Sequence, residues 1–274
     1  MCSKNYSLEE IKNECSDLEQ EILKMYLNRV KQKDICNALQ ITRNKIDTLV
    51  RKYNLKRFRD RKNYICKNIN IDNPDFWYFL GLFASDGNLY NCSGTDVVQF
   101  TLDDKEALED IKSILGYTGN IYEYNKTNKL RYYLKISDTN LINTIKSIFG
   151  DCYRKTHSLI FPQINNEDNL KMFLRGFIDG DGSFTKYSNP KFYKFKLYCA
   201  SVSFMTTFNN YISNIINGNE LKKNMYITGN TLEISSIKAV YSLFKFLYSY
   251  HPNIGILRKK ERAMQHIKNY ELKI

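Results

Sequence analysis

Residues 79–87 read FLGLFASDG and residues 174–182 read LRGFIDGDG, and this repeated stretch decides the fold. A single copy would be an ordinary apolar helix stopped by a turn, because Asp-Gly favours turns and glycine often ends a helix. Two copies in register are informative, since they divide the chain from residue 73 onward into two halves with the same pattern. In the aligned copies the aspartates are Asp86 and Asp181.

Both copies carry a small residue at the third and seventh positions, one helical turn apart: Gly81 and Ser85, then Gly176 and Gly180. Such positions lie on one face of a helix and let two helix backbones approach closely. Side-by-side packing would bring the two C-terminal ends together, so that the two aspartates converge. Carboxylates at helix C-termini need a compensating cation, and oxygen ligands suit a hard ion such as Mg²⁺.

Alternating residues after each copy predict antiparallel strands. Residues 130–136 read LRYYLKI and residues 194–199 read KFKLYC. In the first strand one face gathers Arg131, Tyr133 and Lys135. In the second strand one face gathers Lys194, Lys196 and Tyr198. A basic and aromatic sheet face could lie in a DNA groove and contact phosphates and base edges, although an ordinary solvated face is the alternative.

The charge of the chain indicates an acidic partner. Its 274 residues carry a formal net charge of +12, and the excess of Lys and Arg gathers in residues 22–67, which favours a nucleic-acid docking surface. The three histidines lie far apart and no GxxxxGK[ST] loop is present, so we expect neither a zinc hydrolase nor a nucleotide cofactor. No apolar stretch is long enough to cross a bilayer, so we expect a soluble intracellular protein without a membrane partner, in the cytoplasm of a bacterium or phage-infected cell or in an organelle.

Residues 17–29, 31–39 and 42–53 have apolar side chains in helical rhythm, and the second and third segments are typical of a helix-turn-helix. The turn position where glycine is common is Gln40, which departs from that pattern. Thr42 would be the N-cap of the third helix. The exposed first turn would offer the residues that we expect to contact DNA: Thr42, Arg43, Asn44 and Lys45. A helical bundle packed on the main domain is the alternative.

Residues 51–62 read RKYNLKRFRDRK, a basic connector without an apolar face after Leu55. Such a segment can lie along DNA phosphates without a fixed conformation. We expect phosphate contacts from Arg57, Arg59 and Arg61, and a plain solvated linker is the alternative.

The two nonapeptides resemble the paired signature of the LAGLIDADG homing endonucleases, in the single-chain form with two motifs, over residues 73–274. The resemblance implies an α+β fold of two pseudo-symmetric αββαββα halves with a saddle-shaped antiparallel sheet, which the small all-α helix-turn-helix domain would precede. It implies that Asp86 and Asp181 bind metal and cut one strand each, aided by the main-chain carbonyls of Ser85 and Gly180. It also implies two or three Mg²⁺ ions at the paired motif, and double-stranded DNA as the partner of a monomer.

The family also places a lysine from each half near the metals. By this resemblance we assign Lys155 and Lys259, with Lys260 able to exchange with Lys259, and ordinary surface lysines are the alternative. The sixth motif position is Asp179 in the second copy but Ala84 in the first, on a different helix face from the catalytic acid, so little chemistry should be lost. The polar residue that would support the first metal site stays open among three candidates: Gln99, Asp103 and Asp104.

The predicted domains are a helix-turn-helix domain at 1–56, a basic linker at 57–72, and the two halves at 73–165 and 166–274. The predicted function is a metal-dependent, staggered double-strand break at a long DNA target. The alternatives are a non-cleaving DNA-binding regulator and an RNA-binding intron maturase on the same fold. Should the two sites differ, the site around Asp86 should cut more slowly, because its half lacks the sixth-position acid and a clear supporting residue.

Overall fold

The computed structural model describes residues 15–28, 30–53, 55, 64–126, 129–153, 155–186, 193–216, 225–250 and 253–271. The chain divides into two compact units, which we call the N-terminal unit (residues 1–63) and the paired-motif unit (residues 64–274). Three arginines predicted to contact DNA phosphates lie outside the described residues: Arg57, Arg59 and Arg61. Among the described residues, no helix is long and apolar enough to span a membrane.

The N-terminal unit contains three helices in its described part: α2 (Asp17–Leu27), α3 (Gln32–Leu39) and α4 (Arg43–Lys52). Each lies within one of the three predicted ranges. The Ser16 side chain and Glu19 form a reciprocal capping box that starts α2, which satisfies two donors that the first helical turn leaves open. The helices share a small core of buried apolar side chains: Ile22, Leu23, Tyr26, Ile35, Ile46, Leu49, Val50 and Tyr53.

The turn between α3 and α4 explains how the chain manages without the expected glycine. Gln40 adopts the left-handed conformation with φ +52°, and its side-chain Nε2 donates to the carbonyl of Asn37 at 2.9 Å. Thr42 is the N-cap of α4 as predicted, but its side chain makes no capping hydrogen bond. The four residues predicted to contact DNA are all exposed at the start of α4: Thr42, Arg43, Asn44 and Lys45.

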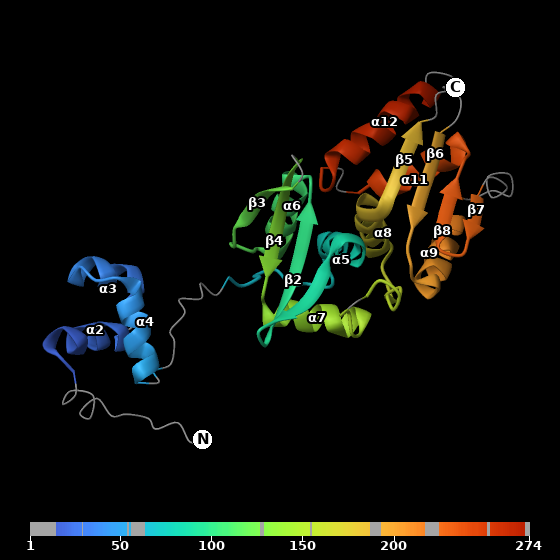
Figure 1. Cartoon of the computed structure of the whole chain (residues 1–274). Coiled ribbons are helices and arrows are strands. Elements are labelled where there is room, and N and C mark those ends of the chain that lie inside the picture. The colour runs from blue at the N-terminus through green and yellow to red at the C-terminus, as the bar shows by residue number, and fades with distance from the viewer. Residues whose placement is uncertain are drawn as a thin grey trace. The chain divides into compact units, whose positions relative to one another are not determined.

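The paired-motif unit contains two four-stranded antiparallel sheets with the same connectivity (Figure 1). The first sheet has the order β1-β2-β4-β3, from strands β1 (Asn88–Cys92), β2 (Thr95–Leu102), β3 (Ile121–Lys126) and β4 (Lys129–Ile136). The second has the order β5-β6-β8-β7, from strands β5 (Gly182–Lys186), β6 (Tyr193–Tyr198), β7 (Met225–Thr228) and β8 (Thr231–Ile234). The shared order confirms the predicted pseudo-symmetric α+β fold.

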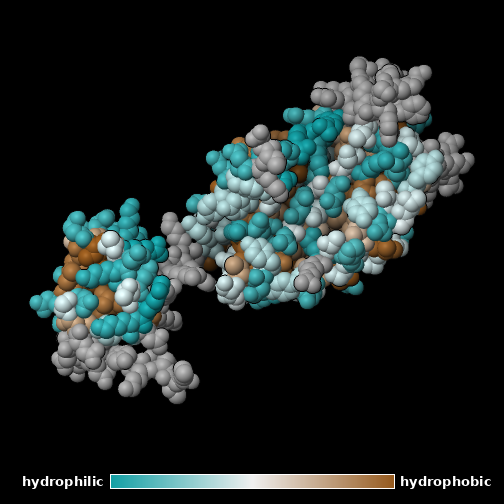
Figure 2. All heavy atoms as spheres, in the orientation of Figure 1, coloured by the Kyte–Doolittle hydropathy of each residue, from teal (hydrophilic) through white to brown (hydrophobic). Residues whose placement is uncertain are grey.

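Helices complete each half in the predicted αββαββα sequence. The first half uses α5 (Pro74–Asp86), α6 (Lys105–Leu115) and α7 (Thr139–Phe149). The second uses α8 (Glu167–Asp181), α9 (Val202–Ile215) and α11 (Ile237–Tyr248), after which α12 (Leu257–Glu271) follows. One apolar core runs through both halves. On the face of the paired-motif unit drawn in Figure 2, apolar residues are scattered among polar ones.

Candidate active site at the paired helix ends

Helices α5 and α8 lie side by side between the two sheets (Figure 1). Both begin at an asparagine N-cap, where Asn73 accepts from the Asp75 nitrogen and Asn166 accepts from two nitrogens of α8. The predicted close approach along the small residues is confirmed. A Cβ atom at Gly81 would lie 2.9 Å from the nitrogen of Phe177 and would overlap the carbonyl oxygen of Phe173. Backbone therefore packs directly on backbone.

The same contact continues to the C-terminal ends of the helices. At Gly180, a Cβ atom would overlap the side chain of Ser85 and would lie 2.8 Å from Oδ2 of Asp86. Asp86 and Asp181 are the last residues of α5 and α8, and a strand begins one or two residues after each. The convergence of the two carboxylates is thus a consequence of glycines that permit contact between the helices.

The electrostatic setting disfavours two charged carboxylates at this place. Both aspartate side chains keep an exposed edge, yet the surrounding protein removes enough water to raise the pKa of Asp86. Loss of water and the negative charge of Asp86 together raise the pKa of Asp181 to about 6. The positive charges of Lys155 and Lys259 oppose both shifts. A site of this kind favours an additional cation.

The two predicted lysines reach these helix ends, one at each. Nζ of Lys155 donates to the carbonyls of Ala84 at 2.5 Å and Ser85 at 3.1 Å. The last carbonyls of a helix have no partner within the helix, so each ammonium group satisfies acceptors that would otherwise stay open. Burial lowers the pKa of Lys155, and the negative charges of Asp181 and Asp86 only partly offset this shift.

Lys259 makes the matching contacts at the end of α8. Its Nζ donates to the carbonyl of Gly180 at 2.5 Å and to that of Gly182 at 2.9 Å. Burial lowers its pKa too. The neighbouring Lys260 points elsewhere, with Nζ 5.8 Å from the ring centroid of Tyr248. Of the two lysines that could exchange by sequence, Lys259 is the one at the helix end.

A divalent cation fits the donors present. The carbonyls of Ser85 and Gly180, which we predicted as metal ligands, each accept a hydrogen bond from a lysine ammonium group. In this structure the two ammonium groups therefore occupy positions that a metal cation could take. Among the residues that the structure describes, no group of three or more His, Cys, Asp and Glu side chains gathers to hold a metal. Two carboxylates with few other protein ligands suit Mg²⁺, which keeps several waters and takes phosphate oxygens as ligands.

A pocket of about 200 Å³ opens beside Asp181. Its walls carry three cationic side chains, one hydroxyl group and the Asp181 carboxylate, so the cations outnumber the acid and favour an anion. The lining residues are Gly180, Asp181, Gly182, Ser183, Phe184, Arg258, Lys259 and Arg262.

A comparison with protein families finds a match in the first half. The family model described as "LAGLIDADG-like domain" matches residues 73–150, which span α5 to the end of α7. Residues 73–150 are similar to this family, and we call them the LAGLIDADG-like domain after the match. No curated protein sequence matches the chain.

Several solved structures are similar to this chain at low identity. The LAGLIDADG meganuclease I-AabMI bound to uncleaved DNA is 15% identical with a TM-score of 0.46, over 73% of this chain and 91% of its own. I-CpaMI bound to uncleaved DNA is 14% identical with a TM-score of 0.47, over 72% and 90%. The homing endonuclease I-GzeII in complex with a DNA target is 15% identical with a TM-score of 0.48, over 73% and 91%.

Asp179, at the sixth motif position of α8, points into the protein as expected and not toward the paired carboxylates. Its side chain is buried and accepts hydrogen bonds from the hydroxyls of Tyr78 at 3.1 Å and Tyr248 at 3.2 Å. The guanidinium of Arg175 is also buried and lies 4.5 Å from the ring centroid of Tyr248. In the LAGLIDADG-like domain, the equivalent Ala84 is buried and has no polar group in its side chain. The internal role of Asp179 was not predicted.

The three candidates for a supporting residue in the LAGLIDADG-like domain have different surroundings. Gln99 lies opposite Asn88 in the sheet, and its Oε1 accepts from the Tyr90 hydroxyl at 3.0 Å. Asp103 pairs with Lys129 and with Arg131, whereas Asp104 pairs with Arg258. Both acids therefore form ion pairs. Gln99 is the candidate that lies opposite β1, the strand that follows the first motif.

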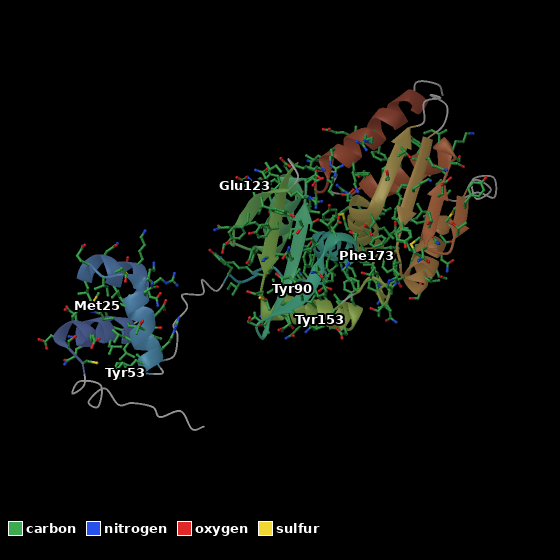
Figure 3. The ribbon with its side chains drawn as sticks, in the orientation of Figure 1. Met25, Tyr53, Tyr90, Glu123, Tyr153 and Phe173 are labelled. Atoms are coloured by element: carbon green, nitrogen blue, oxygen red, sulfur yellow. The ribbon has the colours of Figure 1, made fainter. Side chains whose placement is uncertain are left out.

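The predicted strand faces are present, but acids neutralise part of their charge. In the first sheet, Nε of Arg131 lies 2.9 Å from Asp103, while Tyr133 stacks on Tyr122 with ring centroids 5.2 Å apart. Lys135 lies over the Tyr133 ring, with Nζ 5.4 Å from its centroid. Figure 3 labels Tyr90, which belongs to β1 of the same sheet, and Phe173, which belongs to α8.

The corresponding face of the second sheet carries a cluster of three charged side chains. Glu233 pairs with Lys194 and, at 3.0 Å, with Lys196, so one acid lies between both predicted DNA-contacting lysines. The register places Lys196 directly opposite Glu233. The alternating pattern of residues 194–199 predicted the face with the two lysines. It could not predict Glu233, because that residue lies in β8, a distant strand that pairs with β6.

Proposed function

We propose that this chain is a site-specific DNA endonuclease that makes a metal-dependent, staggered double-strand break at a long DNA target. The observation that carries the proposal is the convergence of Asp86 and Asp181 at touching helix ends, with one lysine on each end. Two such sites in one chain match a reaction that must hydrolyse one phosphodiester bond in each strand. A single chain would then suffice, so we propose a monomer.

Each proposed site has acids, carbonyls and a lysine with separate tasks. Asp86 and Asp181, with the carbonyls of Ser85 and Gly180, would hold two or three Mg²⁺ ions. Bound there, the ions would supply Lewis-acid activation of water and stabilise the leaving oxygen. Lys155 and Lys259 would neutralise charge that develops on the phosphate, because a desolvated ammonium group acts strongly at short range. An ion on either carbonyl competes with the ammonium group that now donates to it.

The DNA would be read by surfaces outside these sites. In the paired-motif unit we propose contacts by Arg131, Tyr133, Lys135, Lys194 and Lys196. In the N-terminal unit we propose helix-turn-helix contacts by Thr42, Arg43, Asn44 and Lys45. A net charge of +12 supports a polyanionic partner. We further propose Gln99 as the polar support of the first site, since Asp103 and Asp104 are held in ion pairs.

Cleavage of a randomised double-stranded DNA library tests the proposal whatever the target sequence is. The full chain is incubated with the library and Mg²⁺, and the ends produced are sequenced. We expect a long recurrent sequence cut on both strands with a stagger, and no cutting when EDTA replaces Mg²⁺. The strand cut by the site around Asp86 should be cut more slowly. Metal-independent binding of a sequence without any cutting would instead support a regulator and contradict the nuclease.

A further inference from the structure

The segment that carries Lys259 is held by acids from other helices. Oδ2 of Asp110 accepts a hydrogen bond from the nitrogen of Gly255 at 2.9 Å. Oδ2 of Asp179 accepts one from the nitrogen of Ile256 at 3.3 Å. These nitrogens belong to the two residues just before α12, where the helix dipole favours negative charge. The two carboxylates therefore hold the backbone at the start of α12.

A third acid holds the first turn of the same helix. Nε of Arg258 lies 2.9 Å and 3.0 Å from the two carboxylate oxygens of Asp104. Asp104 is the N-cap of α6, but its side chain does not cap that helix and reaches α12 instead. Asp104 and Asp110 both belong to the LAGLIDADG-like domain, whereas α12 follows the second half. The first half thus holds the segment that serves the end of α8.

Gly255 makes this anchoring possible. Its φ of +120° lies in a region that side chains disfavour, and a Cβ atom there would lie 3.2 Å from the Tyr78 hydroxyl and 2.5 Å from Oδ2 of Asp179. Only a glycine lets the backbone come this close to the buried carboxylate. One turn later, the nitrogen of Lys259 donates to the carbonyl of Ile256 at 3.0 Å. The anchored backbone at Gly255 and Ile256 therefore fixes the position of the Lys259 main chain.

The residue two positions before Lys155 is held by a different set of contacts, which stays within the first half. Tyr153 forms a parallel bridge with Leu89, and its hydroxyl lies 3.1 Å from Nζ of Lys146. Lys146 in turn pairs with Asp96 at 2.7 Å. The contacts of this arrangement involve neither Asp104 nor Asp110, so the two lysines can be disturbed separately.

We propose that Asp104 and Asp110 are positioning residues through which the first half holds Lys259 against the end of α8. The importance of this position for cleavage rests on the proposed function. The anchoring itself does not, because it can be measured without DNA or metal. Neither acid touches the paired carboxylates or the reacting groups, and each acts through the backbone or Arg258 of α12.

Acylation of lysines by N-hydroxysuccinimide acetate, read by tandem mass spectrometry on the metal-free full chain, tests the proposal. In the Asp104→Ala/Asp110→Ala variant, the labelling rate of Lys259 should rise about tenfold, the change expected when a charge-assisted hydrogen bond is lost. Labelling of Lys155 should stay at the wild-type rate. The matched control is Glu106→Ala/Glu109→Ala, which removes two exposed acids from the same helix and should leave Lys259 protected.

Two further variants separate positioning from general loosening. Asp110→Asn keeps an oxygen acceptor for Gly255 and should label like the wild type, whereas Gly255→Ala should expose Lys259 with all acids intact. An unchanged Lys259 rate in the double alanine variant, or an equal rise at Lys155 and Lys259, would overturn the proposal. A wild-type chain that cuts no DNA would contradict the proposed function and would leave this labelling result valid. In an active chain, the double variant should slow cutting of one strand only.

Discussion

Gly176 of α8 faces Leu82 of α5 so closely that a Cβ atom at the glycine would lie 2.8 Å from the Leu82 nitrogen. The reciprocal contact of Gly81 with Phe177 has almost the same geometry, at 2.9 Å. Backbone contact on this scale leaves no room for a methyl group on either side. We call this contact between α5 and α8 the seam, and it ends at the two motif aspartates. The stability of the fold and the geometry of the candidate site therefore depend on the same interface.

Gly81→Ala should therefore destabilise the protein strongly. The methyl group meets backbone atoms that cannot rotate away, so we expect a loss of about 3 kcal/mol in the free energy of unfolding. For a unit of this size the melting temperature should fall by about 6–12 °C, measured by circular dichroism. Gly94→Ala is the control, since nothing lies within 4 Å of its Cβ position and only the φ of +80° opposes the change. A loss no larger than that of the control would contradict the tight seam.

Asp179→Ala should be among the most destabilising changes outside the seam. Burial raises the pKa of Asp179, and Arg175 lowers it in opposition, so the carboxylate and the guanidinium depend on each other. Removing one partner leaves a buried charge, which costs about 3–5 kcal/mol. Urea unfolding should show this loss, and a smaller one for Asp179→Asn, which retains an acceptor for the tyrosine hydroxyls. Equal stability of Asp179→Ala and wild type would mean that Arg175 does not need this acid.

Asp181 should titrate with a midpoint at about pH 6 in the metal-free protein. An unfolded aspartate titrates at about pH 3.9, so the folded chain holds an extra proton between those values. The free energy of unfolding contributed by Asp181 therefore falls as the pH rises through this window. Carbon-detected NMR of the aspartate carboxyl groups measures the midpoint directly. It should move down in Asp86→Asn, because the neighbouring charge is gone, and a wild-type midpoint near that of an unfolded aspartate would refute the electrostatic description.

Glu233→Gln should strengthen binding to DNA and steepen its salt dependence. The glutamate now pairs with Lys194 and Lys196, so its neutralisation frees two ammonium groups for phosphates. Each new phosphate contact adds about 0.9 to the slope of log affinity against log salt, hence up to about 1.8 for two. Fluorescence anisotropy in EDTA measures the slope, with Glu123→Gln in the first sheet as the matched charge control. An unchanged slope would show that these lysines do not contact phosphates.

Local patterns predicted the parts of the site that depend on the backbone, and long-range packing decided the rest. Gly81 and Gly176 mark a backbone contact between two helices that a side chain at either position would prevent. The Asp-Gly pairs mark where the two helices end, so the convergence of the carboxylates could be predicted. The choice between Lys259 and Lys260 depends on the rotation of α12, which its sequence alone does not set. Contacts across the halves carry no local signal.

The acids of α6 and β8 illustrate this limit. Asp104 was predicted as a possible metal support, but the structure pairs it with Arg258 on a helix that lies 154 positions later in the chain. Glu233 had no predicted role, because only strand pairing brings it beside Lys196. Gln40 shows the opposite case, in which a departure from the usual glycine is tolerated by a side-chain hydrogen bond to the preceding turn.

Strand-resolved cleavage by Asp86→Asn and Asp181→Asn tests the central claim most directly. Each variant is incubated with Mg²⁺ and a plasmid that carries the mapped target, and the nicked strand is identified by denaturing electrophoresis. We predict that the wild type linearises the plasmid, that neither variant makes a double-strand break, and that the double variant binds the target without cutting it. Double-strand cutting at the wild-type rate by both single variants would contradict the account of the paired carboxylates.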